Sequence, residues 1–408
     1  MYHLLFTIYH LLFTILPLEG ELERVCHLLS PPRGGVRGGL LFLLSLTACV
    51  GGGNSPSTTA QGADIQMQYA GLITMKQCPG YIYAQIRNPW DSAAVLHSYI
   101  LVPRDAPEPT GNLPQGDIVR IPLKNSVVYT MVHCGLIDEL GAYDQIKGVC
   151  DLRYIDIPKV QADAKTGKLK NLGEGLNPNI EAIINMSPDA ILLSPFQNDG
   201  GYGRLSKLGI PIVECADYME TSALGRAEWM KFYGLLYGRE QTADSLFRQV
   251  VCRYDSLKQL AATAKEHPTV VTDLKYGAAW YVPAGGSTTG QMLADAAADY
   301  IFKDYPESGN LTLAPETVFD RAAEAQYWII RYNQATDKTY DELSLEYTNY
   351  AQMAAFRNRN IYACNTARIP FYKEAPFHPD LLLRDFILIL HPDILKGEKT
   401  RYYKKMKE

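Results

Sequence analysis

Histidine and carboxylate side chains are the first candidates for chemistry in this chain, but their spacing does not form a metal site. Beyond the N-terminal segment, no histidine lies at ligand-like spacing from another; they occur at His97, His133, His267, His378 and His391. A zinc or manganese site needs three or four converging donors. We therefore expect no direct metal-ion site. His133, which follows an apolar segment, remains a candidate contact with a bound ligand.

The sequence also lacks the motifs of common enzyme classes. It contains no GxSxG, HExxH, P-loop or dinucleotide-binding pattern at a strand-to-helix turn. Gly200-Gly201-Tyr202-Gly203 is rich in glycine but has the wrong spacing for a dinucleotide loop. Asp295 and Asp299 lie four residues apart on a predicted helix and are interpreted as surface charge. We expect that the protein is not an enzyme.

Cys49 lies in a context that predicts lipid attachment. Two arginines precede a short apolar segment, residues 40–46, which is too short to span a bilayer and has the layout of a secretory signal. Leu46-Thr47-Ala48-Cys49 resembles the lipobox at which bacterial lipoproteins are cleaved and acylated on cysteine. We expect residues 1–48 to be the signal and lipobox region and residues 49–63 to be a flexible Gly/Ser/Asn tether.

The later cysteines show neither a CxxC pair nor a zinc pattern. We expect buried free thiols at Cys78, Cys134, Cys150, Cys215, Cys252 and Cys364.

Composition is that of an ordinary globular protein. The 408 residues are 47% hydrophobic and 20% charged, and the chain is long enough for two or three domains. The net charge is −5 and basic residues cluster only at the C-terminus, so we expect no nucleic-acid partner.

One long segment without Gly or Pro, residues 239–267, organises the predicted fold. Its apolar side chains recur at helical spacing, and 29 residues would span about 40 Å. Apolar strand candidates alternate with helices on both sides of it, which is typical of parallel sheets covered on both faces. We predict an α/β protein with two Rossmann-like lobes joined by a single long α-helix and an extra N-terminal β-rich segment. A cleft between the lobes would bind the ligand.

The predicted domain boundaries follow from this pattern. The N-terminal lobe covers residues 64–218, and its first part, residues 64–120, is the β-rich addition. Residues 219–267 form the interlobe helical backbone, and residues 268–408 form the C-terminal lobe.

A related motif occurs in each predicted lobe. In the first, Asn179-Ile180-Glu181-Ala182-Ile183 is followed by Pro188-Asp189 and an apolar strand. In the second, Pro315-Glu316-Thr317-Val318-Phe319 leads to the apolar strand from Tyr327, although the closing Pro-Asp is replaced. Residues 126–392 thereby resemble the substrate-binding proteins of bacterial ABC importers for cobalamin, ferric siderophores and haem.

The resemblance implies a docking role for one glutamate on each lobe, Glu181 and Glu316. Each lies in the first turn of a predicted helix, where the helix dipole favours a carboxylate. In such proteins these glutamates meet arginines of the membrane permease, and charge-assisted pairs give an interface its geometry. The alternative is a charge that only stabilises the helix end.

The resemblance also places ligand contacts on the loops that face the cleft. Candidates by position are aromatic or polar: His133, Tyr154, Phe196, Tyr202, Tyr218, Tyr276, Trp280, Tyr281 and Tyr332, with Arg331 beside the last. The glycine-rich residues 285–290 open a helix and would either bind an anionic group or form a plain helix cap. Such a row suits a large, flat, partly apolar ligand.

The resemblance implies a transported ligand rather than a resident cofactor. We rank cobalamin or another corrinoid first, a ferric siderophore second and haem third, with His133 open as an axial contact. The expected partners are an ABC permease with its ATPase and a lipid-anchored membrane surface. The expected location is the periplasmic face of a bacterial membrane, and the expected state is a monomer.

Overall fold

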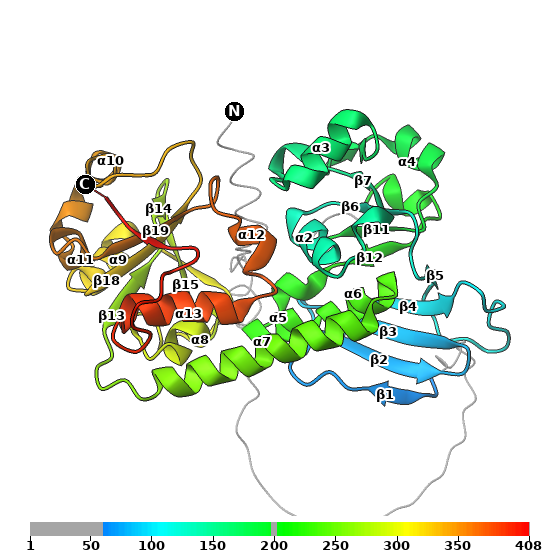
Figure 1. Ribbon diagram of the computed structural model, residues 1–408, viewed down its shortest axis with the longest axis horizontal. Helices are drawn as coiled ribbons and strands as arrows, with labels where there is room; N and C mark the ends of the chain where they lie inside the picture. Colours follow the sequence, from blue (N-terminus) through cyan, green and yellow to red (C-terminus); the bar gives the residue numbers. More distant parts are fainter. Residues whose placement is uncertain (1–59, 197–201, 408) are drawn as a thin grey trace, which may run out of the picture.

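A computed structural model describes residues 60–196 and 202–407 of the chain (Figure 1). Cys49 and most of the predicted tether lie outside these residues. Within them the chain forms a five-stranded N-terminal sheet and two α/β lobes, each with its own five-stranded sheet. The predicted α/β class with two lobes is confirmed.

The N-terminal sheet has the strand order β1-β2-β3-β4-β5. Its strands pair antiparallel except for β4 and β5, and they are β1 (Ala63–Ile65), β2 (Ile73–Cys78), β3 (Tyr81–Arg87), β4 (Val95–Pro103) and β5 (Asp117–Ile121). Tyr99 joins this sheet to the first lobe, because its hydroxyl donates to the carbonyl of Ile212 at 3.0 Å and accepts from the amide of Glu214 at 2.9 Å.

The first lobe is built on a parallel sheet with the order β12-β11-β6-β7-β8. Apolar runs such as Ala190–Leu193 are buried throughout, as expected for strands covered on both faces. The strands are β6 (Ser126–Val128), β7 (Ile146–Val149), β8 (Lys170–Asn171), β11 (Ala190–Leu193) and β12 (Ile212–Glu214). The helices are α2 (Met131–Glu139), α3 (Pro158–Thr166) and α4 (Ile180–Met186), and β9 (Gly173–Glu174) pairs with β10 (Asn177–Pro178).

Three helices connect the lobes, where the sequence predicted one: α5 (Ala223–Glu228), α6 (Met230–Tyr237) and α7 (Glu240–Ala261). Gly238, at φ +64°, separates α6 from α7. The longest, α7, has 22 residues rather than 29. Residues 262–267 are mostly exposed, so they lack the tertiary packing that stabilises helical turns. Along the lower edge of the molecule in Figure 1, α7 packs against α6 and against α13 (Pro379–Leu390).

The second lobe has a sheet with the order β16-β13-β18-β19-β20, parallel except for β20. A three-stranded sheet, β14-β15-β17, is added to it. These strands are β13 (Thr269–Thr272), β14 (Lys275–Tyr276), β15 (Ala279–Pro283), β16 (Asp299–Tyr300), β17 (Asn310–Leu313), β18 (Tyr327–Tyr332), β19 (Ile361–Asn365) and β20 (Lys404–Lys405). The remaining helices are α8 (Thr288–Asp295), α9 (Pro315–Ala322), α10 (Tyr340–Glu346), α11 (Ala354–Arg357) and α12 (Phe371–Glu374).

Two buried glutamates in the segment that connects the lobes anchor the turn between β1 and β2. Glu228 accepts hydrogen bonds from the amides of residues 68, 69 and 70 at 2.7–2.9 Å. Glu220 accepts from the amides of Gly71 and Leu72, each at 2.9 Å. Amide donors stabilise a buried carboxylate, so these contacts fasten the N-terminal sheet to the helices between the lobes.

Five of the six cysteines within the described residues are buried free thiols, as predicted. Cys252 is exposed, because it lies on the solvent face of α7, and the prediction for it was wrong. Among these same residues no helix is long and apolar enough to cross a membrane.

Candidate ligand-binding site

The predicted ligand residues lie mainly where the parallel strands end. In the first lobe, loops follow the carboxyl ends of β6, β7, β11 and β12, and in the second they follow β13 and β18. Ligands of open α/β sheets bind in the crevice outside the carboxyl ends of the strands. Figure 1 shows the two lobes facing each other across α12 and α5.

Six of the predicted aromatic residues have accessible side chains. Tyr276, on the hairpin of β14 and β15, is 44% exposed, and Tyr281 on the same hairpin is half-buried. Four more half-buried residues follow β7, β11 and β12: Tyr154, Phe196, Tyr202 and Tyr218. Arg153 stacks on the ring of Tyr154 at 4.7 Å, and the Tyr218 hydroxyl donates to the carbonyl of Pro195. The two lobes thus present aromatic faces with polar tips from separate loops.

Trp280 and Tyr332 are buried rather than presented to a ligand. The Trp280 indole donates to the carbonyl of Thr272 at 3.3 Å and packs against Trp328 and Tyr350, with ring centroids 6.0 and 5.5 Å away. The Tyr332 hydroxyl accepts from the amide of Lys338 at 2.8 Å. Their packing assigns both residues to the core of the second lobe, and we leave them out of the candidate site.

His133 is also buried, and both of its ring nitrogens are occupied. Nε2 lies 2.8 Å from a carboxylate oxygen of Asp217, and Nδ1 lies 2.6 Å from the hydroxyl of Thr130, which caps α2. Asp217 also accepts from Tyr233 at 2.9 Å and from Arg226 at 3.0 Å. This arrangement does not support a ligand contact or an axial role for His133, because no ring nitrogen is available to a metal.

The charges of this buried group stabilise one another. Burial alone would lower the pKa of His133, but Cys215 and Asp217, through charge and hydrogen bonding, raise it to about 10. Burial alone would raise the pKa of Asp217, but His133, Arg226 and Tyr233 lower it. An imidazolium and a carboxylate are therefore paired beneath the loop that carries Tyr218.

Arg331 is the main cation on the second lobe's side of the site. One guanidinium nitrogen lies 3.4 Å from Asp273, and the group stacks on Phe371 of α12 at 5.3 Å. Burial would lower the pKa of Arg331, but the charge of Asp273 raises it. Tyr372 adjoins the Arg331 guanidinium and was not among the residues predicted from sequence. Burial raises the pKa of Tyr372, while Arg331 and Arg226 act to lower it.

The glycine-rich residues 285–290 pack against the protein's own backbone. A Cβ atom on Gly285 would lie 2.0 Å from the carbonyl oxygen of Lys303, and one on Gly286 would lie 2.2 Å from that of Pro306. The Ser287 hydroxyl accepts from the amide of Gly290 at 3.1 Å, which caps α8. Close packing explains the glycines, and the structure favours the helix cap over an anion site.

Comparison with known proteins identifies the family. A family model described as periplasmic binding protein matches residues 127–367, which is more than half of the chain. The chain belongs to this periplasmic binding protein family. The matched segment contains both lobes' parallel sheets up to β19 and begins after the N-terminal sheet.

Relatives of this family member match about two thirds or more of its length. Two uncharacterised lipoproteins of Methanocaldococcus jannaschii are each 27% identical to it, over 76% and 77% of this chain and 77% and 81% of theirs. A possible iron-binding, periplasmic solute-binding protein of Staphylococcus epidermidis has a TM-score of 0.52 at 20% identity, covering 66% of this chain and 99% of that one. A periplasmic haem-binding protein of Pseudomonas aeruginosa has a TM-score of 0.53 at 15% identity, covering 70% and 99%. The two structures show a shared fold.

The two predicted docking glutamates of this periplasmic binding protein are both exposed. Glu181 lies in the first turn of α4, which Asn179 caps through the amide of Ala182 at 3.0 Å. Glu316 lies in the first turn of α9 and follows Pro315. Within residues 60–196 and 202–407 neither carboxylate takes part in an ion pair, so both side chains are presented to solvent.

Donors for a metal ion do not gather in this member of the family. Across the described residues, no three His, Cys, Asp or Glu side chains are placed to hold a metal ion. The His97 imidazole lies between Asp117 at 3.0 Å and Glu214 at 3.3 Å, and these contacts join the N-terminal sheet to β12.

Proposed function

We propose that this periplasmic binding protein captures a large metal chelate, a corrinoid or an iron complex, between its lobes. The observation that carries the proposal is the set of accessible tyrosines on loops at the carboxyl ends of both sheets. Tyrosine offers a flat apolar face and a polar tip at low entropic cost, which suits a broad ligand with mixed surface. A small ion would instead require clustered donors.

The proposed contacts are six aromatic residues and one cation. From the first lobe they are Tyr154, Phe196, Tyr202 and Tyr218, and from the second Tyr276, Tyr281 and Arg331. Arg331 lies 3.4 Å from the carboxylate of Asp273 and would also pair with an acidic group of the ligand. We rank a corrinoid first, a ferric siderophore second and haem third; His133 as an axial ligand no longer supports haem.

Delivery would proceed by docking on an ABC permease. Glu181 and Glu316 are exposed, one on each lobe, and would pair with permease arginines. The protein would act as a monomer, held at the periplasmic face of the membrane by a lipid on Cys49. The two Methanocaldococcus jannaschii relatives are named as lipoproteins, which supports this anchor.

Calorimetric titration of the protein with cobalamin, haem and a panel of ferric siderophores tests the proposal. We expect one-to-one binding of one of these chelates, weakened at least tenfold by Tyr276→Ala because an exposed aromatic contact is lost. Tyr81→Ala, a half-buried tyrosine of the N-terminal sheet, is the matched control and should bind normally. Equal loss in both variants, or binding of free Fe³⁺ alone, would contradict the proposed site.

A further inference from the structure

The lobes meet directly at a second place, apart from the connecting helices. The short helix α12 belongs by sequence to the second lobe but packs against α2 of the first (Figure 1). A Cβ atom on Gly135 of α2 would lie 2.8 Å from the carbonyl oxygen of Lys373, so only glycine permits this approach. Phe377 continues the contact, with its ring centroid 6.3 Å from that of His133 and 6.0 Å from that of Tyr233.

A hydrogen-bonded pair, Glu139 and His378, closes this contact at its edge. Both carboxylate oxygens of Glu139, the last residue of α2, lie 2.9–3.0 Å from Nε2 of His378, which precedes α13. A carboxylate is disfavoured at a helix C-terminus, where the helix dipole is negative. The Glu139 carboxylate therefore occupies a helix end that its own charge destabilises, and its contact with His378 across the two lobes offsets this effect.

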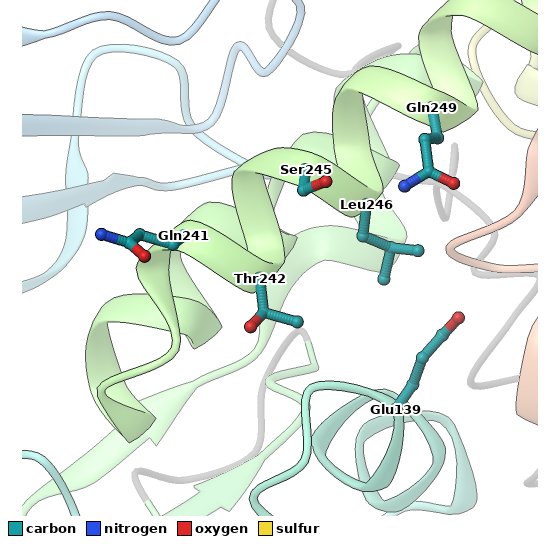
Figure 2. A pocket seen from close by; sticks show the side chains of 6 residues that line it. All are labelled: Glu139, Gln241, Thr242, Ser245, Leu246 and Gln249. Atoms are coloured by element: carbon teal, nitrogen blue, oxygen red, sulfur yellow. The ribbon is translucent and has the colours of Figure 1, made fainter.

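The surroundings of the pair permit it to open. The Glu139 side chain is 39% exposed and borders a hollow of about 390 Å³ whose other wall is the polar face of α7. Figure 2 shows Glu139 pointing from α2 toward the part of α7 that carries Leu246 and Gln249. Water can solvate the carboxylate when the pair separates, so opening leaves no buried, unpaired charge at Glu139.

The charges around His378 keep the imidazole near this position. Asp380 of α13 lies 3.9 Å from its Nδ1 and is itself bound by Arg253 of α7 at 2.5 Å. On α12, Glu374 is paired with Arg401 at 2.7 Å. The Glu139 side chain is 39% exposed and that of His378 is 9% exposed. A substitution at Glu139 therefore disturbs the surrounding packing less than one at His378.

We propose that residues 366–378 form a strap between the lobes and that the Glu139–His378 pair is its latch. Separation of the latch loosens the strap and lets the lobes move apart at the cleft. This device goes beyond the proposed function and does not depend on which ligand the cleft accepts.

Hydrogen–deuterium exchange of the full chain in detergent, without ligand, tests the latch. Glu139→Lys replaces the carboxylate that His378 contacts with an ammonium group, and we expect amides of residues 371–378 to exchange on the order of tenfold faster because the hydrogen bond is lost. Glu307→Lys, the same charge change at an exposed loop residue of the second lobe, is the control and should leave exchange unchanged. The swapped pair, Glu139→Lys with His378→Glu, should restore slow exchange.

The sheet cores distinguish opening from unfolding. Strands β6, β11, β13 and β18 should keep their exchange rates in every variant. The latch is refuted if Glu139→Lys leaves residues 371–378 unchanged, if the swap does not restore them, or if the core strands accelerate equally. Because no ligand is present, these outcomes are independent of the titration that tests the proposed function.

Discussion

The buried pair of His133 and Asp217 makes a pH-dependent prediction for His133→Gln. The His133 side chain is 3% exposed and that of Asp217 is 0%, so water screens their interaction little. Breaking a buried pair costs about 3–5 kcal/mol. Arg226 and Tyr233 still bind Asp217 in the variant, so we expect the low end, about 3 kcal/mol less free energy of unfolding.

The pH range follows from the direction of each pKa shift. The pKa of His133 rises on folding from 6.5 to about 10, so its contribution is complete below pH 6.5 and is lost as the pH rises through about 10. The pKa of Asp217 falls on folding, so its contribution is present above its ordinary 3.8 and is lost as the pH falls through its folded value. The pair therefore stabilises the folded protein most between pH 3.8 and pH 6.5, the ordinary pKa values of Asp217 and His133.

Urea unfolding of the wild type and His133→Gln, at about pH 6, pH 8 and pH 9.5, measures the effect. The difference in free energy of unfolding should be largest at the lowest of these values and shrink toward the highest. His267→Gln, at an exposed histidine, serves as the control and should show a smaller difference. A difference for His133→Gln that does not change with pH would refute the charged pair. If the folded variant did not bind ligand, His133 would instead have to be counted among the ligand contacts.

Three further predictions concern the junctions and the docking face. Glu228→Gln replaces one of the two carboxylate oxygens that accept from three backbone amides with an NH2 donor. It should cost about 2 kcal/mol and let proteases cut near residues 68–72, and resistance equal to wild type would contradict the anchor. Burial lowers the pKa of the partly exposed His97, but Glu214 and Asp117 raise it overall. His97→Gln should therefore cost at most about 1 kcal/mol of the free energy of unfolding below pH 6.5, and less as the pH rises. A cost that grows with pH would contradict this. Glu181→Ala with Glu316→Ala should retain ligand affinity in calorimetry and abolish uptake in a transport assay, whereas Asp341→Ala at another exposed acid should transport normally.

Periodic apolar runs made the parallel sheets predictable. Residues 190–193 and 327–331 read as buried strands from sequence, and the structure places them in β11 and β18. The motif around Glu181 predicted the family, which the match over residues 127–367 confirms. These signals are local, so a single sequence contains them.

The packing of distant segments was not predictable in the same way. His133 follows a strand, as a ligand residue would, but Asp217 and Phe377 surround it from remote parts of the chain. Trp280 alternates with accessible neighbours on β15, and only Trp328 and Tyr350 decide that it is core. The four-residue helix α12, which carries Tyr372, is too short to show helical periodicity.

Mapping hydrogen–deuterium exchange with and without the chelate that calorimetry selects is the most direct test of the central claim. We expect slower exchange in the loops after β7, β12 and β13, on both lobes, with the N-terminal sheet unchanged. Protection confined to the hollow beside α7, or to the N-terminal sheet, would place the ligand outside the cleft and contradict the proposed site.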